Sequence, residues 1–228
     1  MWIAGFDPGG KGNFGWCVVE ASDRLPLFLR RSGIESNAAD AVGRVLQAVP
    51  RSESLIAAGI DSPLFWSATG DRNADRVIRK QIAELGATAS SGTVQHVNSL
   101  KGACLVQGVL AAYLLRQALP SIRITESHPK ALLWLVHVAA ATRPVSSISM
   151  RALGNLIRCD AEGLSEHERD AALGAVGAWA MIVKPAGWRD LSRDESHPFM
   201  PVPPVEYWMP QNAAEPRLAA DAPQAARR

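Results

Sequence analysis

Two short apolar runs, each ending in an aspartate, limit most strongly what this chain can fold into. The first, Trp2 to Phe6, ends at Asp7 before a Pro-Gly-Gly turn, and the second, Leu55 to Ile60, ends at Asp61 before Ser62-Pro63. Short apolar runs bounded by turn residues predict β-strands. An aspartate at a strand end can simply open a turn through its side chain, and for either residue alone that role is the more common one. Their repetition favours a functional role for both.

Composition places the chain among proteins with a sizeable buried core. Its 228 residues, 47% of them apolar, suffice for one domain with or without a tail. No run of about 18 apolar residues occurs, and no basic segment leads into an apolar one, so we expect neither a membrane span nor a secretory signal, and a cytoplasmic location. The three cysteines are widely spaced, which argues against a disulfide framework and a structural zinc site. The net charge of +2 neither requires nor excludes nucleic acid.

The order of the predicted elements indicates an α/β fold. The first third predicts closely spaced strands, as in an antiparallel meander, over Trp2–Phe6, Phe14–Val19 and Leu25–Arg31. Two further strands are predicted at Leu55–Ile60 and Ser121–Thr125. Helical patterns cover Ala38–Val49, Asp75–Leu85, Gly102–Leu119, Lys130–Ala140, Ser147–Cys159 and Glu166–Val183. The chain therefore moves from a meander to crossover connections.

The last of these helices has two features that set its place in the fold. Ser165 and Glu168 are spaced as a capping box at its start. Alanine and glycine are frequent along it, and because glycine lowers helix stability, we expect close packing against a sheet as compensation. Asp170, rather than the capping Glu168, lies on the same side as Leu173 and Gly174, which we expect to face the sheet.

The chain divides into a domain over residues 1–190 and a tail over residues 191–228. Beyond Phe199, proline and alanine dominate and interrupt any periodic pattern. Such a composition is typical of a segment that is partly disordered or draped over the domain. The cluster Tyr207-Trp208-Met209 is the part of the tail that could dock on the domain.

Four acids occupy comparable places in this order of elements. Asp7, Asp61 and Glu126 end predicted strands, and Asp170 lies in the first turns of the last helix. Hard cations such as Mg²⁺ prefer carboxylate oxygens, and acids gathered without a cation raise one another's pKa. Two such ions about 4 Å apart would activate a water and stabilise the leaving oxygen in phosphodiester hydrolysis. The four acids therefore predict a site for Mg²⁺ or Mn²⁺.

The motifs that contain these acids resemble those of a known family. Over roughly residues 1 to 185 the chain resembles the predicted nucleases of the family called domain of unknown function 429, in the ribonuclease H-like superfamily. The resemblance is carried by Gly5-Phe6-Asp7-Pro8-Gly9-Gly10, Ile60-Asp61-Ser62-Pro63, Gly70-Asp71-Arg72 with Asp75 and Arg79, Thr125-Glu126-Ser127-His128-Pro129, and Arg169-Asp170-Ala171.

This resemblance implies a fold and a set of site residues. The fold would be a five-stranded mixed sheet flanked by helices, with the first three strands antiparallel. The acids would lie on strand one, strand four and the last helix. Asp7, Asp61 and Asp170 match the superfamily's metal positions, and Glu126 matches the family's own Glu-x-His-Pro motif as a catalytic ligand or base.

Three arginines near the second aspartate are candidates for binding substrate phosphate. Arg72, Arg76 and Arg79 lie three or four residues apart near one short helix, which would gather guanidinium groups suited to bidentate phosphate contact. The alternative is a solvated face on which they pair with Asp71 and Asp75. The sequence leaves both interpretations open.

Lys11 and His128 are further candidates for contact with substrate. Lys11 lies in the glycine-rich turn after the first strand, where it could touch phosphate or serve only solubility. His128 could be a proton shuttle near the metals, although a lone histidine is more often structural. The seven tryptophans lack a spacing that would gather them for base stacking.

The residues support one main function and two alternatives. The first is a divalent-metal-dependent nuclease acting on DNA or RNA. The second is a non-catalytic nucleic-acid or protein-binding module, because fold does not fix function. An actin-like phosphotransferase is disfavoured, since it needs a duplicated domain and a second glycine-rich phosphate turn. The choice between DNA and RNA stays open, as does the oligomeric state, with a homodimer among the options.

Overall fold

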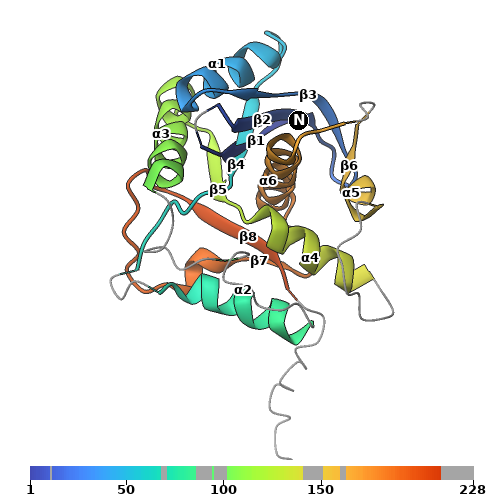
Figure 1. Cartoon of the computed structure of the whole chain (residues 1–228), viewed down its shortest axis with the longest axis vertical. Helices are drawn as coiled ribbons and strands as arrows, with labels where there is room; N and C mark the ends of the chain where they lie inside the picture. The colour runs from blue at the N-terminus through green and yellow to red at the C-terminus, as the bar shows by residue number, and fades with distance from the viewer. Residues whose placement is uncertain are drawn as a thin grey trace, which may run out of the picture.

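Eight strands form one mixed sheet at the centre of the residues that the structure describes (Figure 1). This computed structural model describes residues 1–10, 12–67, 71–85, 94, 102–140, 151–159 and 163–211. The strands are β1 (Trp2–Pro8), β2 (Phe14–Glu20), β3 (Leu27–Glu35), β4 (Leu55–Ile60), β5 (Arg123–Glu126), β6 (Ile157–Arg158), β7 (Trp188–Asp190) and β8 (Glu206–Pro210). The helices are α1 (Ala38–Ala48), α2 (Asn73–Glu84), α3 (Gly102–Ala118), α4 (Pro129–Ala140), α5 (Arg151–Leu156), α6 (Glu166–Val183) and the 3-10 helix η2 (Leu191–Asp194).

The first three strands pair antiparallel, as the sequence predicts. β1 pairs antiparallel with β2, and β2 pairs antiparallel with β3. On its other side β1 pairs in parallel with β4, which pairs in parallel with β5. The expectation of an α/β fold with a mixed sheet and flanking helices is therefore confirmed.

The predicted total of five strands is wrong, because short strands extend both edges of the sheet. At one edge β6 pairs in parallel with β3, and at the other β8 pairs in parallel with β5 and antiparallel with β7. β6 has only two residues and ends the segment predicted as a helix over Ser147–Cys159, of which α5 forms the described helical part. Strands this short carry no readable alternation of polar and apolar residues.

Helix α6 lies unusually close to the centre of the sheet, because small residues line both surfaces. A Cβ atom added at Gly5 would lie 1.8 Å from the carbonyl oxygen of Ala171, and one at Gly59 would lie 1.9 Å from that of Gly174. The close packing predicted for this helix is confirmed, as is its capping box. This approach brings Asp170 of α6 to the ends of β1 and β4.

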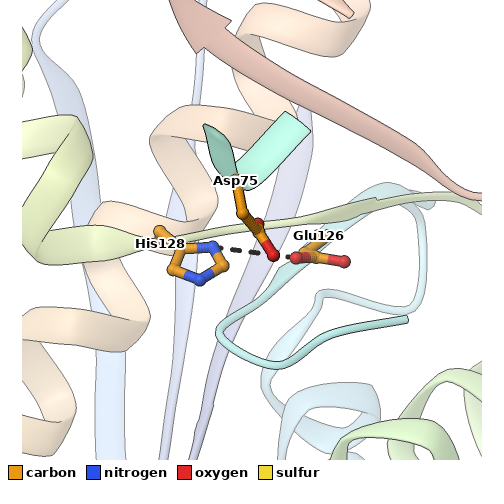
Figure 2. A group of neighbouring side chains, drawn as sticks. All are labelled: Asp75, Glu126 and His128. Carbon is orange, nitrogen blue, oxygen red and sulfur yellow. Dashed lines mark ion pairs between the residues drawn. The ribbon is translucent and has the colours of Figure 1, made fainter. Parts of the chain in front are cut away.

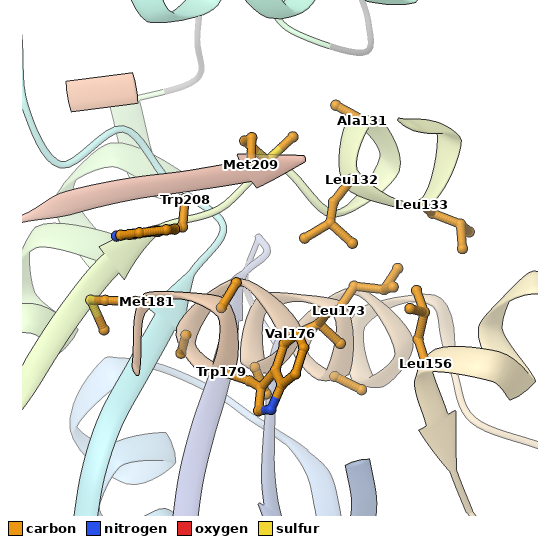
Figure 3. Packing of buried hydrophobic residues seen from close by; sticks show 14 of the residues in the cluster. Ala131, Leu132, Leu133, Leu156, Leu173, Val176, Trp179, Met181, Trp208 and Met209 are labelled. Carbon is orange, nitrogen blue, oxygen red and sulfur yellow. The ribbon is translucent and has the colours of Figure 1, made fainter. Parts of the chain in front are cut away.

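Two apolar cores cover the opposite faces of the sheet (Figure 1). On one face α4 packs on α6, and Figure 3 shows Leu132 of α4 above Leu173 and Val176 of α6, with Trp208 and Met209 of β8 beside them. On the other face α1 and α3 contribute Ala41, Val45, Ala111 and Leu115. Within the described ranges, none of the helices has the length and apolar character that crossing a membrane would require.

Part of the predicted tail belongs to the sheet. Residues 206–210 form β8, in which Tyr207 and Met209 are fully buried. Prolines before this strand hide its pattern in the sequence, since Pro203 and Pro204 allow no regular periodicity. Residues 212–228 lie outside the described residues, and the domain boundary after residue 190 stays a prediction.

Candidate functional site

Three of the four predicted acids line one cleft of about 420 Å³. Asp7 belongs to β1, Asp61 directly follows β4, and Asp170 belongs to α6. The parallel pairing of β1 with β4 puts the first two side by side, and the Asp61 amide donates a hydrogen bond of 2.9 Å to the Phe6 carbonyl. The structure thus brings residues from three separate segments to one place. We call Asp7, Asp61 and Asp170 the cleft acids.

Burial raises the pKa of each cleft acid, and the charges of the other cleft acids add to the increase for Asp7 and Asp61. Burial raises the pKa of Asp7 to about 6, with a further increase from the charge of Asp170 and an opposing effect from His167. Burial also raises the pKa of Asp61 well above its usual value, and the charges of Asp7 and Asp170 add to this increase. The pKa of Asp170 is raised for the same first reason, against the charges of nearby cations. A bound cation would stabilise the ionised form of all three.

His167 contacts a cleft acid directly, although the sequence did not identify it as a site residue. Its Nδ1 lies 2.6 Å from Oδ2 of Asp7, and the residue lines the cleft. His167 precedes Asp170 by three residues on α6, so the two share one face of the helix. That spacing was the signal from which His167 could have been found.

Lys130 is a second residue of the cleft that sequence reasoning missed. It lines the cleft from the first turn of α4, and its Nζ lies 2.8 Å from Oε1 of Glu166. The hydrogen bond to Glu166 raises the pKa of Lys130, and the charges of Asp170 and Asp61 contribute in the same direction. Its position directly after the Glu-x-His-Pro motif was the available signal.

Glu126, the fourth predicted acid, lies in a buried ion network rather than among the residues lining the cleft. Its two carboxylate oxygens accept hydrogen bonds of 2.6 and 2.8 Å from Arg72, and one also accepts the Leu64 amide at 2.9 Å. Asp75 binds the same guanidinium at 2.7 and 2.8 Å. Arg72, Asp75 and Glu126 have 0% exposed side chains. We call these three residues the ion network.

The ion network does not match two of the predicted roles. Arg72 was a candidate for substrate phosphate, but its guanidinium is buried and already holds two carboxylates. Glu126 was a candidate catalytic acid, but Arg72 occupies both of its oxygens. Burial raises the pKa of Glu126 to about 7, even though Arg72 acts to lower it. Both charges are compensated inside the protein, so neither residue offers free charge to a substrate.

Asp75, Glu126 and His128 also form a tight group of potential metal ligands (Figure 2). One ligand atom from each lies within 4.8 Å of the others, and among the described residues the cleft acids do not meet this criterion. The group does not need an ion, because Arg72 donates to all four carboxylate oxygens of Asp75 and Glu126. A divalent cation placed there would be repelled by the adjacent guanidinium. In the cleft the charge is compensated only in part, since Nε of Arg169 lies 3.2 Å from Oδ1 of Asp170 and no guanidinium holds two of the cleft acids among the described residues.

The other predicted arginines lie on a solvated face. Nη2 of Arg79 is 2.5 Å from Oδ1 of Asp71, while Arg76 hydrogen-bonds Asn73 and lies 4.0 Å from Asp71. Neither arginine is among the residues lining the cleft. This arrangement matches the ion-paired alternative to phosphate binding. Lys11 lies outside the described residues.

His128 does line the cleft, at the point where it meets the ion network. Its Nδ1 lies 2.6 Å from the hydroxyl oxygen of Tyr207 and 3.7 Å from Oε1 of Glu126. Burial lowers the pKa of His128 to about 4. The ring is therefore neutral at neutral pH, and the structure places it where it can contact a molecule in the cleft.

Comparison with known proteins gives a family match and several structural matches. Residues 5–176 match the family model described as protein of unknown function (DUF429). Among curated proteins, no sequence matches significantly. The structure of Thermus thermophilus RuvC is 19% identical, with a TM-score of 0.43 over 81% of this chain and 97% of that chain. T. thermophilus RuvC in complex with Holliday junction substrate is 18% identical, with a TM-score of 0.42 over 80% of this chain and 96% of that chain. At such low scores, neither structural match supports a functional conclusion.

Proposed function

Since the chain belongs to the DUF429 family of proteins of unknown function, we propose a function from its own cleft: metal-dependent hydrolysis of phosphodiester bonds in nucleic acid. Asp7, Asp61 and Asp170 would hold Mg²⁺ or Mn²⁺. The observation that carries this proposal is the meeting of three acids, from two parallel strand ends and one helix, in a single cleft with incompletely compensated charge.

The donor chemistry of the cleft fits such an ion. Carboxylate oxygens are the ligands that Mg²⁺ and Mn²⁺ prefer. The raised pKa of each cleft acid reflects the cost of keeping its charge buried, and for Asp7 and Asp61 also the charges of the other cleft acids. When bound, divalent ions would generate the attacking hydroxide and stabilise the leaving oxygen.

The surrounding residues would prepare the cleft for a phosphodiester. His167 holds the carboxylate of Asp7 through Nδ1, which fixes the direction of that ligand. Lys130 brings a positive charge to the wall of the cleft, where it can attract an anionic backbone. Gly9 and Gly10, in the turn after β1, line the cleft without side chains, so they leave its entrance open.

The strand order supports placing the chain in the ribonuclease H-like superfamily. The sequence resemblance implies a mixed sheet whose first three strands are antiparallel, and β1, β2 and β3 pair in this way, while β4 pairs in parallel with β1. In that superfamily arrangement the acids of strand one, strand four and the last helix would hold the metal. The cleft acids occupy those three elements.

Cleavage by an Asp7→Asn variant tests the proposal. Labelled DNA and RNA oligonucleotides are incubated with wild-type protein, Asp7→Asn and the control Asp23→Asn, whose side chain is 81% exposed. We expect wild type and the control to cleave with Mg²⁺ or Mn²⁺ and not with EDTA. Loss of a metal ligand should lower the rate by at least about a thousandfold, or about 4 kcal/mol.

Circular dichroism and thermal unfolding check that the Asp7→Asn variant remains folded. Equal cleavage by Asp7→Asn, or no cleavage of either substrate by wild type with either metal, contradicts the proposal. Nucleic-acid binding that survives both chelation and loss of all three cleft acids would instead favour a non-catalytic binding module.

A further inference from the structure

The backbone around His128 is held firmly between the cleft and the ion network. His128 lies in the connection between β5 and α4. The Ser127 amide donates to the Ile60 carbonyl at 2.8 Å, and the Leu132 amide donates to the His128 carbonyl at 2.9 Å. The first bond ties this connection to the end of β4, directly before Asp61. The position of the His128 ring in the cleft is therefore set by the sheet.

One nitrogen of the His128 ring is used inside the protein. Nδ1 lies 2.6 Å from the Tyr207 hydroxyl oxygen, and the two ring centroids are 5.5 Å apart. Tyr207 belongs to β8 and is 0% exposed. Its ring lies 5.8 Å from the guanidinium carbon of Arg72, so the pair borders the ion network. The nitrogen that His128 has left for the cleft is Nε2.

The direction of the hydrogen bond between Tyr207 and His128 follows from the hydroxyl hydrogen of Tyr207. A buried hydroxyl hydrogen requires an acceptor. Among the described residues, the Tyr207 hydroxyl has no hydrogen-bond partner other than Nδ1 of His128. Tyr207 therefore donates and Nδ1 accepts. A neutral imidazole carries one proton, so that proton is on Nε2.

The charges around the ring agree with this neutral form. Burial lowers the pKa of His128 to about 4 and raises that of Tyr207 well above its usual range. The charged groups that act on the ring are Asp75, which favours its protonation, and Arg72 and Arg79, which oppose it. Glu126 lies 3.7 Å from Nδ1, beyond hydrogen-bond distance. No neighbouring acid among the described residues competes with Tyr207 for Nδ1.

We propose that His128 donates its Nε2–H to a non-bridging oxygen of the phosphate bound in the cleft, and that Tyr207 is the positioning residue that fixes this tautomer. The proposal rests on the proposed function of the cleft and adds a substrate-binding residue to it. A charged imidazolium would be attracted to the cleft acids. A neutral donor stays available for phosphate, and its hydrogen bond to that anion is charge-assisted.

The tautomer can be read directly from ring ¹⁵N chemical shifts in the full chain labelled at histidine. We expect Nε2 of His128 to be protonated and Nδ1 to be bare from about pH 8 to about pH 5. Tyr207→Phe removes the donor and should give a mixture of tautomers, while the control Tyr113→Phe, on an exposed part of α3, should not. A proton on Nδ1 in the wild type would overturn the proposal, whatever the activity of the cleft.

The donor role is tested by two substitutions of His128 in the oligonucleotide assay with Mn²⁺. Glutamine places an amide N–H near the position of Nε2, whereas phenylalanine keeps the ring shape without a donor. We expect kcat/KM to fall by no more than about threefold for His128→Gln and by about 10- to 100-fold, mainly through KM, for His128→Phe. The loss in kcat/KM for Tyr207→Phe should lie between the losses for these two variants. Equal losses for His128→Gln and His128→Phe would overturn the donor role.

Failure of the proposed function is distinguishable from failure of this inference. If the wild type binds the oligonucleotides with Mn²⁺ but cleaves none, the nuclease proposal fails, and the affinities of the two His128 variants then test the donor. A weaker affinity for His128→Phe than for His128→Gln supports the donor role in that case. Absence of both cleavage and binding by the wild type overturns both proposals.

Discussion

The cleft and the ion network beside it use the same kinds of side chain but treat charge in opposite ways. In the ion network one guanidinium lies between two carboxylates, and all three side chains are 0% exposed. In the cleft three carboxylates face a cavity, and within the described residues only single contacts reach two of them, from His167 to Asp7 and from Arg169 to Asp170. Acids whose charge is compensated internally hold the fold together. Acids whose charge is left uncompensated are the ones that can bind a cation.

The largest effect is expected from breaking the compensation inside the ion network. Arg72→Met should leave Asp75 and Glu126 buried without a counter-charge and lower the free energy of unfolding by about 3–5 kcal/mol. The matched control Arg76→Met, at a position with a 59% exposed side chain, should change it by less than about 0.5 kcal/mol. Urea unfolding measures both. A loss below about 1 kcal/mol for Arg72→Met would mean that the ion network does not stabilise the fold.

In the cleft, and in the absence of metal, removing a charge should raise the free energy of unfolding rather than lower it. The pKa of Asp7 is raised to about 6, so its ionised form destabilises the folded state above that pH. This destabilisation diminishes as the pH falls from about 6 towards the ordinary value of 3.8. We therefore expect Asp7→Asn to be about 1–3 kcal/mol more stable than wild type near pH 7, with the difference vanishing near pH 4.

Urea unfolding across this pH range in EDTA tests whether the charge of Asp7 destabilises the folded state. Comparing the variant with wild type at each pH removes the titrations that the two proteins share. A variant that is less stable than wild type near pH 7, or a difference that does not change with pH, would show that the charge of Asp7 is compensated as in the ion network.

A divalent cation should stabilise the cleft and thereby the whole chain. At ten times its Kd, Mn²⁺ should raise the free energy of unfolding of the wild type by about 1.4 kcal/mol. Asp7→Asn should show a smaller increase, whereas Asp71→Asn, outside the residues lining the cleft, should respond like wild type. Thermal unfolding with and without Mn²⁺ measures the shift. An equal shift in all three proteins would place the ion outside the cleft.

The smallest effect is expected at the solvated arginines. Arg79 pairs with Asp71 while its side chain is 30% exposed, so Arg79→Ala should cost less than about 1 kcal/mol. It should also leave the salt dependence of oligonucleotide binding unchanged, because an arginine that contacts phosphate would contribute about one unit to its slope. A decrease in that slope for Arg79→Ala would restore the phosphate-binding interpretation of this face.

The parts of the fold that the sequence predicted are those with long or strongly patterned segments. β4 and α6 have the predicted bounds, Leu55–Ile60 and Glu166–Val183, because a buried run and a capping box are local signals. β6, β7 and β8 were missed because they have two to five residues and pair with strands far away in the chain. Such edge strands are fixed by their partners rather than by their own pattern.

In the site, too, contacts between residues far apart in the chain could not be predicted from local patterns. Asp7, Asp61 and Glu126 all lie at strand ends, so their place in the pattern does not by itself show that Glu126 has another environment. The distinction comes from Arg72, which is 54 residues away from Glu126 in the chain and meets it only in the folded protein. His167 was overlooked for a related reason, since its contact with Asp7 spans 160 residues.

The most direct test of the account is where Mn²⁺ binds in a crystal of the full chain. An anomalous difference map collected after soaking with Mn²⁺ distinguishes the cleft from the group formed by Asp75, Glu126 and His128. We expect a peak bound by Asp7, Asp61 and Asp170, with the guanidinium of Arg72 still between Asp75 and Glu126. A peak at Asp75, Glu126 and His128, with the cleft empty, would contradict it.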